Sequence, residues 1–405
     1  MLMVPSAARC VAPRVWTLLG CVVVLGLAAC SSEDKGTPAA EDTPAGGDGQ
    51  DGEDSGTAFQ GFGDPLSWDV TQAGPYGVGH AVVDVTYTPD IGGTRTIPVH
   101  VWYPTLATEG DPVVFLDVFP DAEALGNVPA APPAHDGGYP VVLYSHGYQG
   151  FAGTSAFFMA HVASHGLVAV APDHIDNLLN AFVEPLPTAH YIHRPQDMTV
   201  SLDALADGTF ASVGLDAGAA MTDRVMMSGH SYGVYTTWMS SGAQIVPELI
   251  DSACAGGGGL HTGTCTEGER EAFLSGVLDE PRVVGAIPMA GGFRTDFLGR
   301  EGQGHVHGPL LLLSGTEDDV GAADGFENTP GIDLRWAELE GGCHQTFALG
   351  LCSTLDPDLG FQIVETLGLA FVRSVVLGDD SAEVQGILDG SIPVSDLVVL
   401  QHRTE

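Results

Sequence analysis

One ten-residue segment settles most of the architecture of this chain: Arg224-Val225-Met226-Met227-Ser228-Gly229-His230-Ser231-Tyr232-Gly233. It begins as a buried strand, turns at a Gly-x-Ser-x-Gly motif, and opens the helical pattern of residues 232–241. Small residues on both sides of Ser231 let the backbone turn sharply, so the hydroxyl would project above the edge of a sheet. An ordinary strand-to-helix turn would give no reason for the two glycines. The motif therefore predicts a nucleophilic serine.

The same alternation of strand and helix continues on both sides of this segment. Runs that are apolar on both faces, typical of buried parallel strands, occupy residues 140–144, 167–171, 224–227, 283–289, 310–313 and 334–339. Helical patterns lie between or after them, at residues 155–165, 195–205, 232–241 and 359–376. Earlier, residues 80–87 and 96–103 alternate with period two around Gly92-Gly93, which predicts an antiparallel hairpin. The predicted class is α/β, with an α/β-hydrolase fold whose doubly wound, mostly parallel sheet follows this hairpin.

A serine hydroxyl needs a base to take its proton and a carboxylate to orient that base, and in this fold the order along the chain is serine, acid, histidine. The strand at residues 310–313 runs into a turn that contains Asp318 and Asp319. We expect Asp318 to be the acid, with Asp319 as the alternative, because a one-residue difference in the turn would exchange them. Of the two later histidines, His402 lies close to the end of the chain, where order is poorest, so we expect His344 to be the base.

Acyl transfer also requires N–H donors for the tetrahedral oxyanion, each worth about 3 kcal/mol to the transition state. A glycine-rich turn at residues 145–150 follows an early strand. We assign the oxyanion hole to the backbone N–H of Tyr148 and that of Tyr232, the residue after the serine; a simple strand-end turn is the alternative. We expect His146 to organise this turn. Other histidines are expected at the surface, among them His161, His165, His305 and His307.

The N-terminal region resembles an export signal. Arg9 and Arg14 precede the apolar residues 15–27, which are too few to span a bilayer but are typical of a signal peptide. Residues 27–30, Leu-Ala-Ala-Cys, resemble the lipobox of bacterial lipoproteins. We therefore expect residues 1–29 to be a signal peptide and Cys30 to be the site of lipidation, with an ordinary signal peptide as the alternative.

Composition limits the rest of the organisation and the possible partners. The chain of 405 residues carries 52 Asp plus Glu against 13 Lys plus Arg, a formal net charge of −39, so nucleic acid is an unsuitable partner. Residues 30–57 are acidic and rich in Gly, Pro and Ser, which predicts a tether. Residues 58–405, with their apolar runs, form the predicted hydrolase domain, in which about 242–280 is an insertion or lid.

Four cysteines remain after the predicted lipidation site: Cys254, Cys265, Cys343 and Cys352. An even number in an oxidising compartment predicts two disulfides. The pairs Cys254–Cys265 and Cys343–Cys352 close the shortest loops, although the other two connectivities stay open. Zinc is the rival interpretation, but these spacings match no structural zinc pattern, so we expect neither a metal nor another cofactor.

Residues from about 74 to 376 resemble the platelet-activating-factor acetylhydrolase and predicted dienelactone hydrolase group. The segments that carry the resemblance are Gly74-Pro75-Tyr76-Gly77-Val78-Gly79, Val101-Trp102-Tyr103-Pro104, Ser145-His146-Gly147, Ala171-Pro172-Asp173-His174, Arg194-Pro195-Gln196-Asp197, Gly229-His230-Ser231-Tyr232-Gly233 and the acid and histidine turns. The resemblance implies a metal-independent Ser-Asp-His esterase for short acyl chains of phospholipids or related esters. It maps onto Ser231, Asp318, His344, Tyr148 and Tyr232. Dienelactone hydrolases proper use a cysteine nucleophile, so lactone hydrolysis is not implied.

Taken together, the sequence predicts an exported, lipid-anchored serine ester hydrolase of the bacterial cell envelope. Its partners would be a small-molecule or lipid ester, with acetylated phospholipids as a candidate, and the membrane through acylated Cys30. A cutinase-like polyester hydrolase, a lipase and a serine peptidase would use the same triad and are the alternatives. A non-catalytic surface scaffold is a further alternative, but it has no need of serine, acid and histidine in this order.

Overall fold

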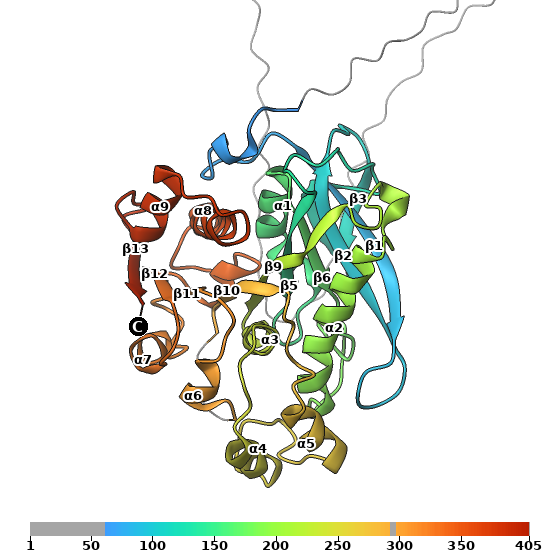
Figure 1. Cartoon of the computed structure of the whole chain (residues 1–405), viewed down its shortest axis with the longest axis vertical. Helices are drawn as coiled ribbons and strands as arrows, with labels where there is room; N and C mark the ends of the chain where they lie inside the picture. The colour runs from blue at the N-terminus through green and yellow to red at the C-terminus, as the bar shows by residue number, and fades with distance from the viewer. Residues whose placement is uncertain (1–60, 292–296, 405) are drawn as a thin grey trace, which may run out of the picture. The chain divides into compact units, whose positions relative to one another are not determined.

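The computed structural model describes residues 61–291 and 297–404 (Figure 1). The predicted signal peptide, the lipidation site Cys30 and the acidic tether lie outside the described residues.

An eleven-stranded sheet crosses the described region in the order β13-β12-β11-β10-β9-β5-β6-β2-β1-β4-β3. Its central strands run parallel to one another and are β12 (Leu334–Leu339), β11 (Leu310–Gly315), β10 (Val283–Met289), β9 (Ala220–His230), β5 (Tyr139–Ser145) and β6 (Val168–Pro172). The predicted hairpin is β1 (Gly77–Tyr87) and β2 (Arg95–Thr105), and β2 joins β6 antiparallel. The α/β-hydrolase fold predicted from the sequence is therefore confirmed.

Edge strands extend this sheet beyond the prediction. The antiparallel pair β3 (Asp111–Phe115) and β4 (Phe119–Gly126) extends one side, and β13 (Val398–Arg403) extends the other. A separate two-stranded sheet is formed by β7 (Asn177–Leu178) and β8 (Ala181–Phe182). Most side chains of β4 and β13 are exposed or half-exposed, so these strands lack the apolar runs that mark a buried strand.

Helices cover both faces of the sheet (Figure 1). One face packs against α1 (Ala156–Ser164), α8 (Pro357–Val376) and α9 (Ala382–Asp389). The other packs against α2 (Ala189–Ala206) and α3 (Tyr232–Ser240), and the same core includes apolar side chains of α4 (Pro247–Cys254), α5 (Glu267–Leu274) and α7 (Ala322–Asn328). The short α6 (Gly299–Gln303) precedes β11. By length and composition α8 could span a membrane, but 67% of its most apolar window is buried inside the domain, as in a core helix.

Helix α2 is longer than predicted and contains a proline in its interior. The sequence predicts a helix that begins at Pro195, whereas α2 begins at Ala189 and places Pro195 in its interior. Proline has no N–H, so the carbonyl of Tyr191, four residues earlier, loses its helical partner. The hydroxyl of Tyr235 on α3 donates to that carbonyl instead, at 2.8 Å. The break in the helical ladder thus becomes a tether between α2 and α3.

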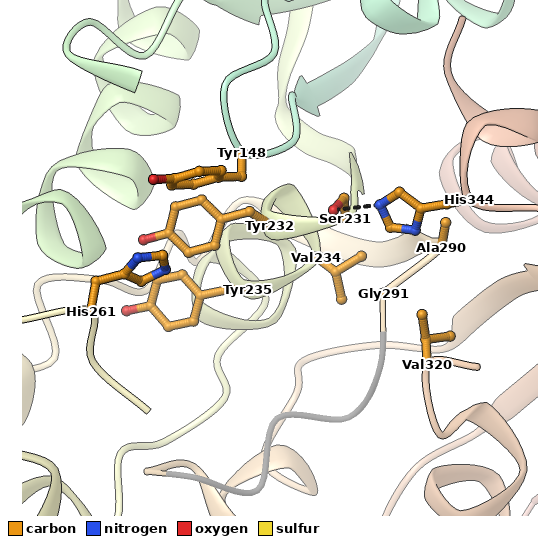
Figure 2. Close-up of a pocket in the computed structure, with 10 residues that line it drawn as sticks. All are labelled: Tyr148, Ser231, Tyr232, Val234, Tyr235, His261, Ala290, Gly291, Val320 and His344. Carbon is orange, nitrogen blue, oxygen red and sulfur yellow. Dashed lines mark hydrogen bonds between the residues drawn. The ribbon is translucent and has the colours of Figure 1, made fainter. Parts of the chain in front are cut away.

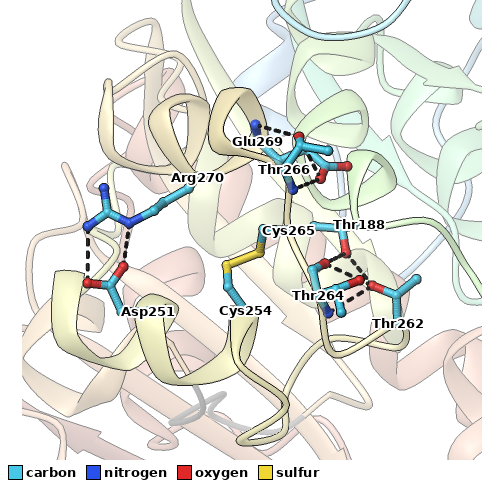
Figure 3. The surroundings of a disulfide bond; sticks show 9 residues. All are labelled: Thr188, Asp251, Cys254, Thr262, Thr264, Cys265, Thr266, Glu269 and Arg270. Atoms are coloured by element: carbon cyan, nitrogen blue, oxygen red, sulfur yellow. Dashed lines mark hydrogen bonds and ion pairs between the residues drawn. A yellow bond between two sulfur atoms is a disulfide. The ribbon is translucent and has the colours of Figure 1, made fainter.

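The segment at residues 242–280 contains α4 and α5, and a disulfide joins Cys254 at the end of α4 to Cys265 just before α5 (Figure 3). Hydrogen bonds from Thr188, just before α2, hold the segment to the rest of the domain: its hydroxyl lies 2.6 Å from that of Thr262 and 2.7 Å from the carbonyl of Thr264. These contacts fix the loop between α4 and α5 beside the start of α2.

A second disulfide joins Cys343 and Cys352. Both cysteine pairs are those that close the shortest loops. Disulfides persist in oxidising compartments, so the two pairs indicate an exported protein.

Candidate active site

Three of the predicted site residues meet at the carboxyl edge of the sheet. Ser231 follows β9, Asp318 follows β11 and His344 follows β12. The Nε2 atom of His344 lies 2.8 Å from the Ser231 Oγ atom (Figure 2), and its Nδ1 atom lies 2.9 Å from an Asp318 carboxylate oxygen. The alternative acid, Asp319, is exposed to solvent, whereas the Asp318 side chain is 13% exposed. The structure thus places Asp318, and not Asp319, against the imidazole.

The hydrogen bonds determine which ring nitrogen of His344 carries the proton. An ionised carboxylate can only accept, so the Nδ1–H group must donate to Asp318. The Nε2 atom is then free to accept the proton of the Ser231 hydroxyl. This tautomer is the one that a general base for Ser231 requires.

The turn at Ser231 is strained and tightly packed. Its φ of 56° and ψ of −115° lie outside the regions that non-glycine residues prefer. Its backbone N–H donates to the carbonyl of Met289 at the end of β10, at 2.9 Å. A Cβ atom at Gly229 would lie 2.5 Å from the Gly233 carbonyl oxygen, and one at Gly233 would lie 1.9 Å from the Ser145 carbonyl oxygen. Both positions of the motif therefore require glycine.

Backbone contacts bring the acid turn and the histidine loop together. A Cβ atom at Gly315 would lie 2.1 Å from the carbonyl oxygen of Gly342, so the two loops touch backbone to backbone. The N–H of Glu317 donates to the same carbonyl at 2.9 Å. Asp318 follows directly and reaches His344 from this junction.

His230, the first of the two variable residues of the serine motif, contacts the histidine loop. Burial lowers the pKa of its imidazole to about 4, so the ring is neutral at neutral pH. Its Nε2 atom lies 2.8 Å from the carbonyl oxygen of His344 and donates to it, since a carbonyl can only accept. Sequence reasoning missed this role because the residue type between the glycine and the serine is unconstrained by the turn itself.

The two residues assigned to the oxyanion hole come from the turn after β5 and from the start of α3. Tyr232 is the first residue of α3, so its N–H group lies at the N-terminus of that helix, where backbone donors and the helix dipole favour negative charge. Tyr148 follows Gly147, whose added Cβ atom would lie 3.2 Å from the Cβ atom of Ser231. Both tyrosines line the same cavity as Ser231.

This cavity has a volume of about 310 Å³. Besides Ser231 and His344 it is lined by Tyr148, Tyr232, Val234, Tyr235, His261, Ala290, Gly291 and Val320 (Figure 2). The ring of His261, which the disulfide-linked segment carries, stacks on Tyr148 with ring centres 5.2 Å apart. Burial and a hydrogen bond to Glu184 raise the pKa of Tyr148 to about 12, so its hydroxyl is neutral. One side of the cavity is therefore aromatic, and the other is formed by small aliphatic residues.

Two histidines that the sequence analysis placed at the surface are buried instead. His161 lies on α1 and is 6% exposed, and His165, directly after that helix, is 2% exposed. Their Nε2 atoms lie 3.3 Å and 2.9 Å from the carbonyl oxygens of Val70 and Gln72, and burial lowers their pKa values to about 3 and 4. The segment that covers them has no regular periodicity, so the sequence carried no sign of this packing. His305 and His307 are exposed, as expected.

The second late histidine, His402, belongs to strand β13 and not to a frayed end. Its Nε2 atom lies 2.7 Å from an Asp333 carboxylate oxygen. This contact is with a different acid from the one that binds His344. Within residues 61–291 and 297–404, no cluster of three or more His, Cys, Asp or Glu side chains could hold a metal ion.

Part of this chain is similar to a known protein family. A chlorophyllase family model matches residues 125–246. The matched part runs from β4 through α3, so it includes the turn before Tyr148 and the Ser231 motif but neither Asp318 nor His344. That family is one of α/β-hydrolase-like proteins related to dienelactone hydrolase and platelet-activating-factor acetylhydrolase. The resemblance to these hydrolases is therefore supported at the level of the wider group, and the match supports an ester hydrolase. A comparison with curated proteins found no significant match.

Proposed function

We propose that the protein is a serine ester hydrolase in which Ser231 is the nucleophile, His344 the general base and Asp318 the group that orients it. The observation that carries this proposal is the continuous hydrogen-bond chain from Asp318 through His344 to Ser231, with links of 2.9 Å and 2.8 Å. This chain ends at a strained, glycine-flanked turn that opens into a cavity. Strain of this kind is typical of functional sites.

The reaction would proceed through an acyl-enzyme. The Ser231 Oγ atom attacks the carbonyl carbon of the ester while its proton passes to His344 Nε2, and the carbonyl oxygen becomes the oxyanion. The backbone N–H groups of Tyr148 and Tyr232 stabilise that charge. The carbon–oxygen bond to the alcohol then breaks, and the alcohol leaves with the proton from His344.

Water completes the cycle. It attacks the acyl carbon while His344 takes one of its protons, the bond to Ser231 breaks, and the serine oxygen recovers that proton as the free acid leaves. Asp318 stays ionised throughout and stabilises the imidazolium that forms in each half of the reaction.

We propose short-acyl esters as the substrate class, with acetylated phospholipids as a candidate. The cavity, at about 310 Å³, lies at the lower end of the range of about 300–1,000 Å³ found for ligand sites, which favours a small acyl group. The formal charge of −39 disfavours anionic surfaces at low ionic strength, so neutral or zwitterionic esters are the better candidates.

We further propose that the enzyme is anchored to a membrane of the bacterial cell envelope through Cys30. The lipobox-like residues 27–30 support the anchor, and the two disulfides support export. Fractionation of cells that express the full chain or the Cys30→Ala variant tests the anchor. The wild-type protein should partition with membranes, and equal partitioning of the variant would contradict the proposal.

The catalytic proposal is tested with the mature chain, residues 31–405, which lacks the predicted signal peptide and lipidated cysteine. The assay measures hydrolysis of p-nitrophenyl esters with acyl groups from acetyl to dodecanoyl. A chlorophyll ester belongs in the panel because the matching family model carries the name chlorophyllase. We expect the highest kcat/KM at two to four acyl carbons, and no specific turnover by Ser231→Ala. Retention of that turnover by the folded variant would refute the role of Ser231, and an optimum at long chains would refute the proposed substrate class.

A further inference from the structure

A fully buried arginine lies behind the proposed oxyanion hole. Arg194 is on α2, and none of its side chain is exposed. Burial lowers the pKa of its guanidinium to about 10, which still leaves it charged at neutral pH. Among the described residues no carboxylate forms an ion pair with it, and the nearby Asp197 is paired with Arg95 and His174 instead. A buried charge without such a partner is costly, so its other contacts need an explanation.

The guanidinium binds the backbone of the turn that leads to Tyr148. Its Nη1 atom donates to the carbonyl oxygen of His146 at 2.8 Å, and its Nη2 atom donates to that of Gly147 at 3.2 Å. A third contact, at 3.4 Å, reaches the hydroxyl of Ser145. One side chain thus contacts three consecutive residues of the turn.

The His146 side chain supports the same carbonyl. Its Nε2 atom accepts the backbone N–H of His174 at 3.0 Å, so the proton of this neutral ring is on Nδ1. The Nδ1–H group donates to the Gly147 carbonyl at 2.8 Å. The 3.2 Å approach of Arg194 Nη2 to Nδ1 is then a contact between two donors that share the Gly147 carbonyl.

Peptide geometry connects these carbonyl contacts with the proposed oxyanion donor. The peptide between Gly147 and Tyr148 is trans, so its C=O and N–H groups point in opposite directions. Because Arg194 and His146 hold the Gly147 carbonyl toward the core, the N–H of Tyr148 points away from the core. Ser231 lies beside this turn, since a Cβ atom added at Gly147 would lie 3.2 Å from the Cβ atom of Ser231.

The same guanidinium contacts the other half of the proposed hole. Its Cζ atom lies 4.4 Å from the centre of the Tyr232 ring, within the range of a cation–π interaction. The two proposed donors belong to different loops, after β5 and after β9, and Arg194 is in contact with the residues that carry or precede both.

We propose that Arg194 is a positioning residue that sets the orientation of the Tyr148 and Tyr232 N–H groups for the oxyanion. This inference rests on the proposed function and deepens it. A hydrogen-bonded chain supports the arrangement from behind: Ser145 lies 2.9 Å from the His174 Nε2 atom, and the His174 Nδ1 atom lies 2.8 Å from Asp197. Arg194 therefore holds the turn as part of a buried hydrogen-bond network that joins α2 to the end of β5.

The test compares Arg194→Met and Arg194→Lys with the wild-type mature chain on a short-acyl p-nitrophenyl ester. Loss of one direct oxyanion donor costs about 10²–10³-fold in kcat in a comparable site, so misorientation of the donors should cost about 10–100-fold. We expect KM to change less than threefold. Inhibition by a trifluoromethyl ketone, which binds as a tetrahedral oxyanion, should weaken in proportion to kcat/KM. Arg194→Lys keeps the charge but lacks the planar, two-pronged donor geometry of the guanidinium, so it should fall between wild type and Arg194→Met.

Arg373→Met is the matched control. Arg373 is also buried, at 2% exposed, but it binds Asp379 and the carbonyl of Trp68. This variant should lose stability without a change in kcat or in ketone affinity. If folded Arg194→Met has the same kcat and ketone affinity as the wild type, the role of Arg194 is refuted while the proposed function stands. If the Met variant does not fold, the same result in Arg194→Lys has the same meaning. Absence of ester hydrolysis by the wild-type chain would overturn the proposed function and this inference with it.

Discussion

Replacement of Asp318 by Asn should nearly abolish turnover while leaving the fold intact. The carboxylate lies 2.9 Å from His344 Nδ1 and accepts a hydrogen bond from its N–H group. An asparagine can present its NH₂ group instead, which favours the tautomer with the proton on Nε2. That proton would face the Ser231 hydroxyl, only 2.8 Å away, so the ring could no longer accept the serine proton.

The expected magnitude follows from the tautomer argument. The corresponding change in a Ser-His-Asp triad lowers kcat by about 10⁴, which is about 5.5 kcal/mol of transition-state free energy. Asp318 is 13% exposed, so water can replace part of the lost interaction, and we expect a loss of about 10³–10⁴-fold. The volume of the side chain hardly changes, and the melting temperature should stay within a few degrees of that of the wild type.

Asp319→Asn provides the matched control, because it makes the same chemical change one residue away on an exposed side chain. The assay is kcat on p-nitrophenyl acetate, with circular dichroism to verify folding. We expect the control to change kcat less than twofold. A large loss in Asp319→Asn together with a small one in Asp318→Asn would refute this account of the acid.

Three further predictions test the packing around the site. Gly233→Ala should lower kcat more than 100-fold or prevent folding, since its Cβ atom would lie 1.9 Å from the Ser145 carbonyl oxygen; Gly268→Ala, where no atom lies within 4 Å, should leave ester turnover and melting temperature nearly unchanged. His261→Ala should shift the ester optimum toward longer acyl chains, because it removes the ring stacked on Tyr148, and an unchanged profile would contradict its role as a cavity wall. Burial lowers the pKa of His190 from 6.5 to about 3, so the unfolded chain binds its proton first and stability falls as the pH drops below 6.5. Denaturant unfolding at pH 7 and pH 5 should therefore show that acid lowers the free energy of unfolding, and that this decrease is smaller in His190→Phe by up to about 2 kcal/mol. Equal decreases in the wild type and the variant would contradict the role of His190.

The central sheet was predictable because its strands are buried on both faces. Runs such as Leu310–Leu313 and Leu334–Leu339 have no polar face, and the helices between them follow a clear period. The edge strands β4 and β13 were not predicted, because backbone hydrogen bonds to the neighbouring strand stabilise them. Most of their own side chains are exposed or half-exposed and form no apolar run. Local sequence carries no record of such pairing.

The same distinction applies to the candidate site. Gly229, Ser231 and Gly233 could be identified because the turn itself demands small residues and the demand is local. The sequence favoured Asp318 but left Asp319 open as an alternative, because the choice depends on how the Gly315 and Gly342 loops meet.

The role of Arg194 could not be read from the sequence. Arg194 stands in one of the segments that carry the resemblance, directly before the helical pattern predicted to begin at residue 195. Its partners are carbonyl groups of a turn almost fifty residues away, and backbone carbonyls have no sequence signature. Pro195, which is often a helix boundary, concealed its position further, because Tyr235 compensates for the missing helical hydrogen bond.

The most direct test of the central claim is mass spectrometry of the mature chain after reaction with a fluorophosphonate, which labels activated serines. We expect one adduct, on the peptide that contains Ser231, and a large loss of labelling in His344→Ala, because the base that activates the hydroxyl is gone. An unlabelled Ser231 in a folded protein, or equal labelling with and without His344, would contradict this expectation.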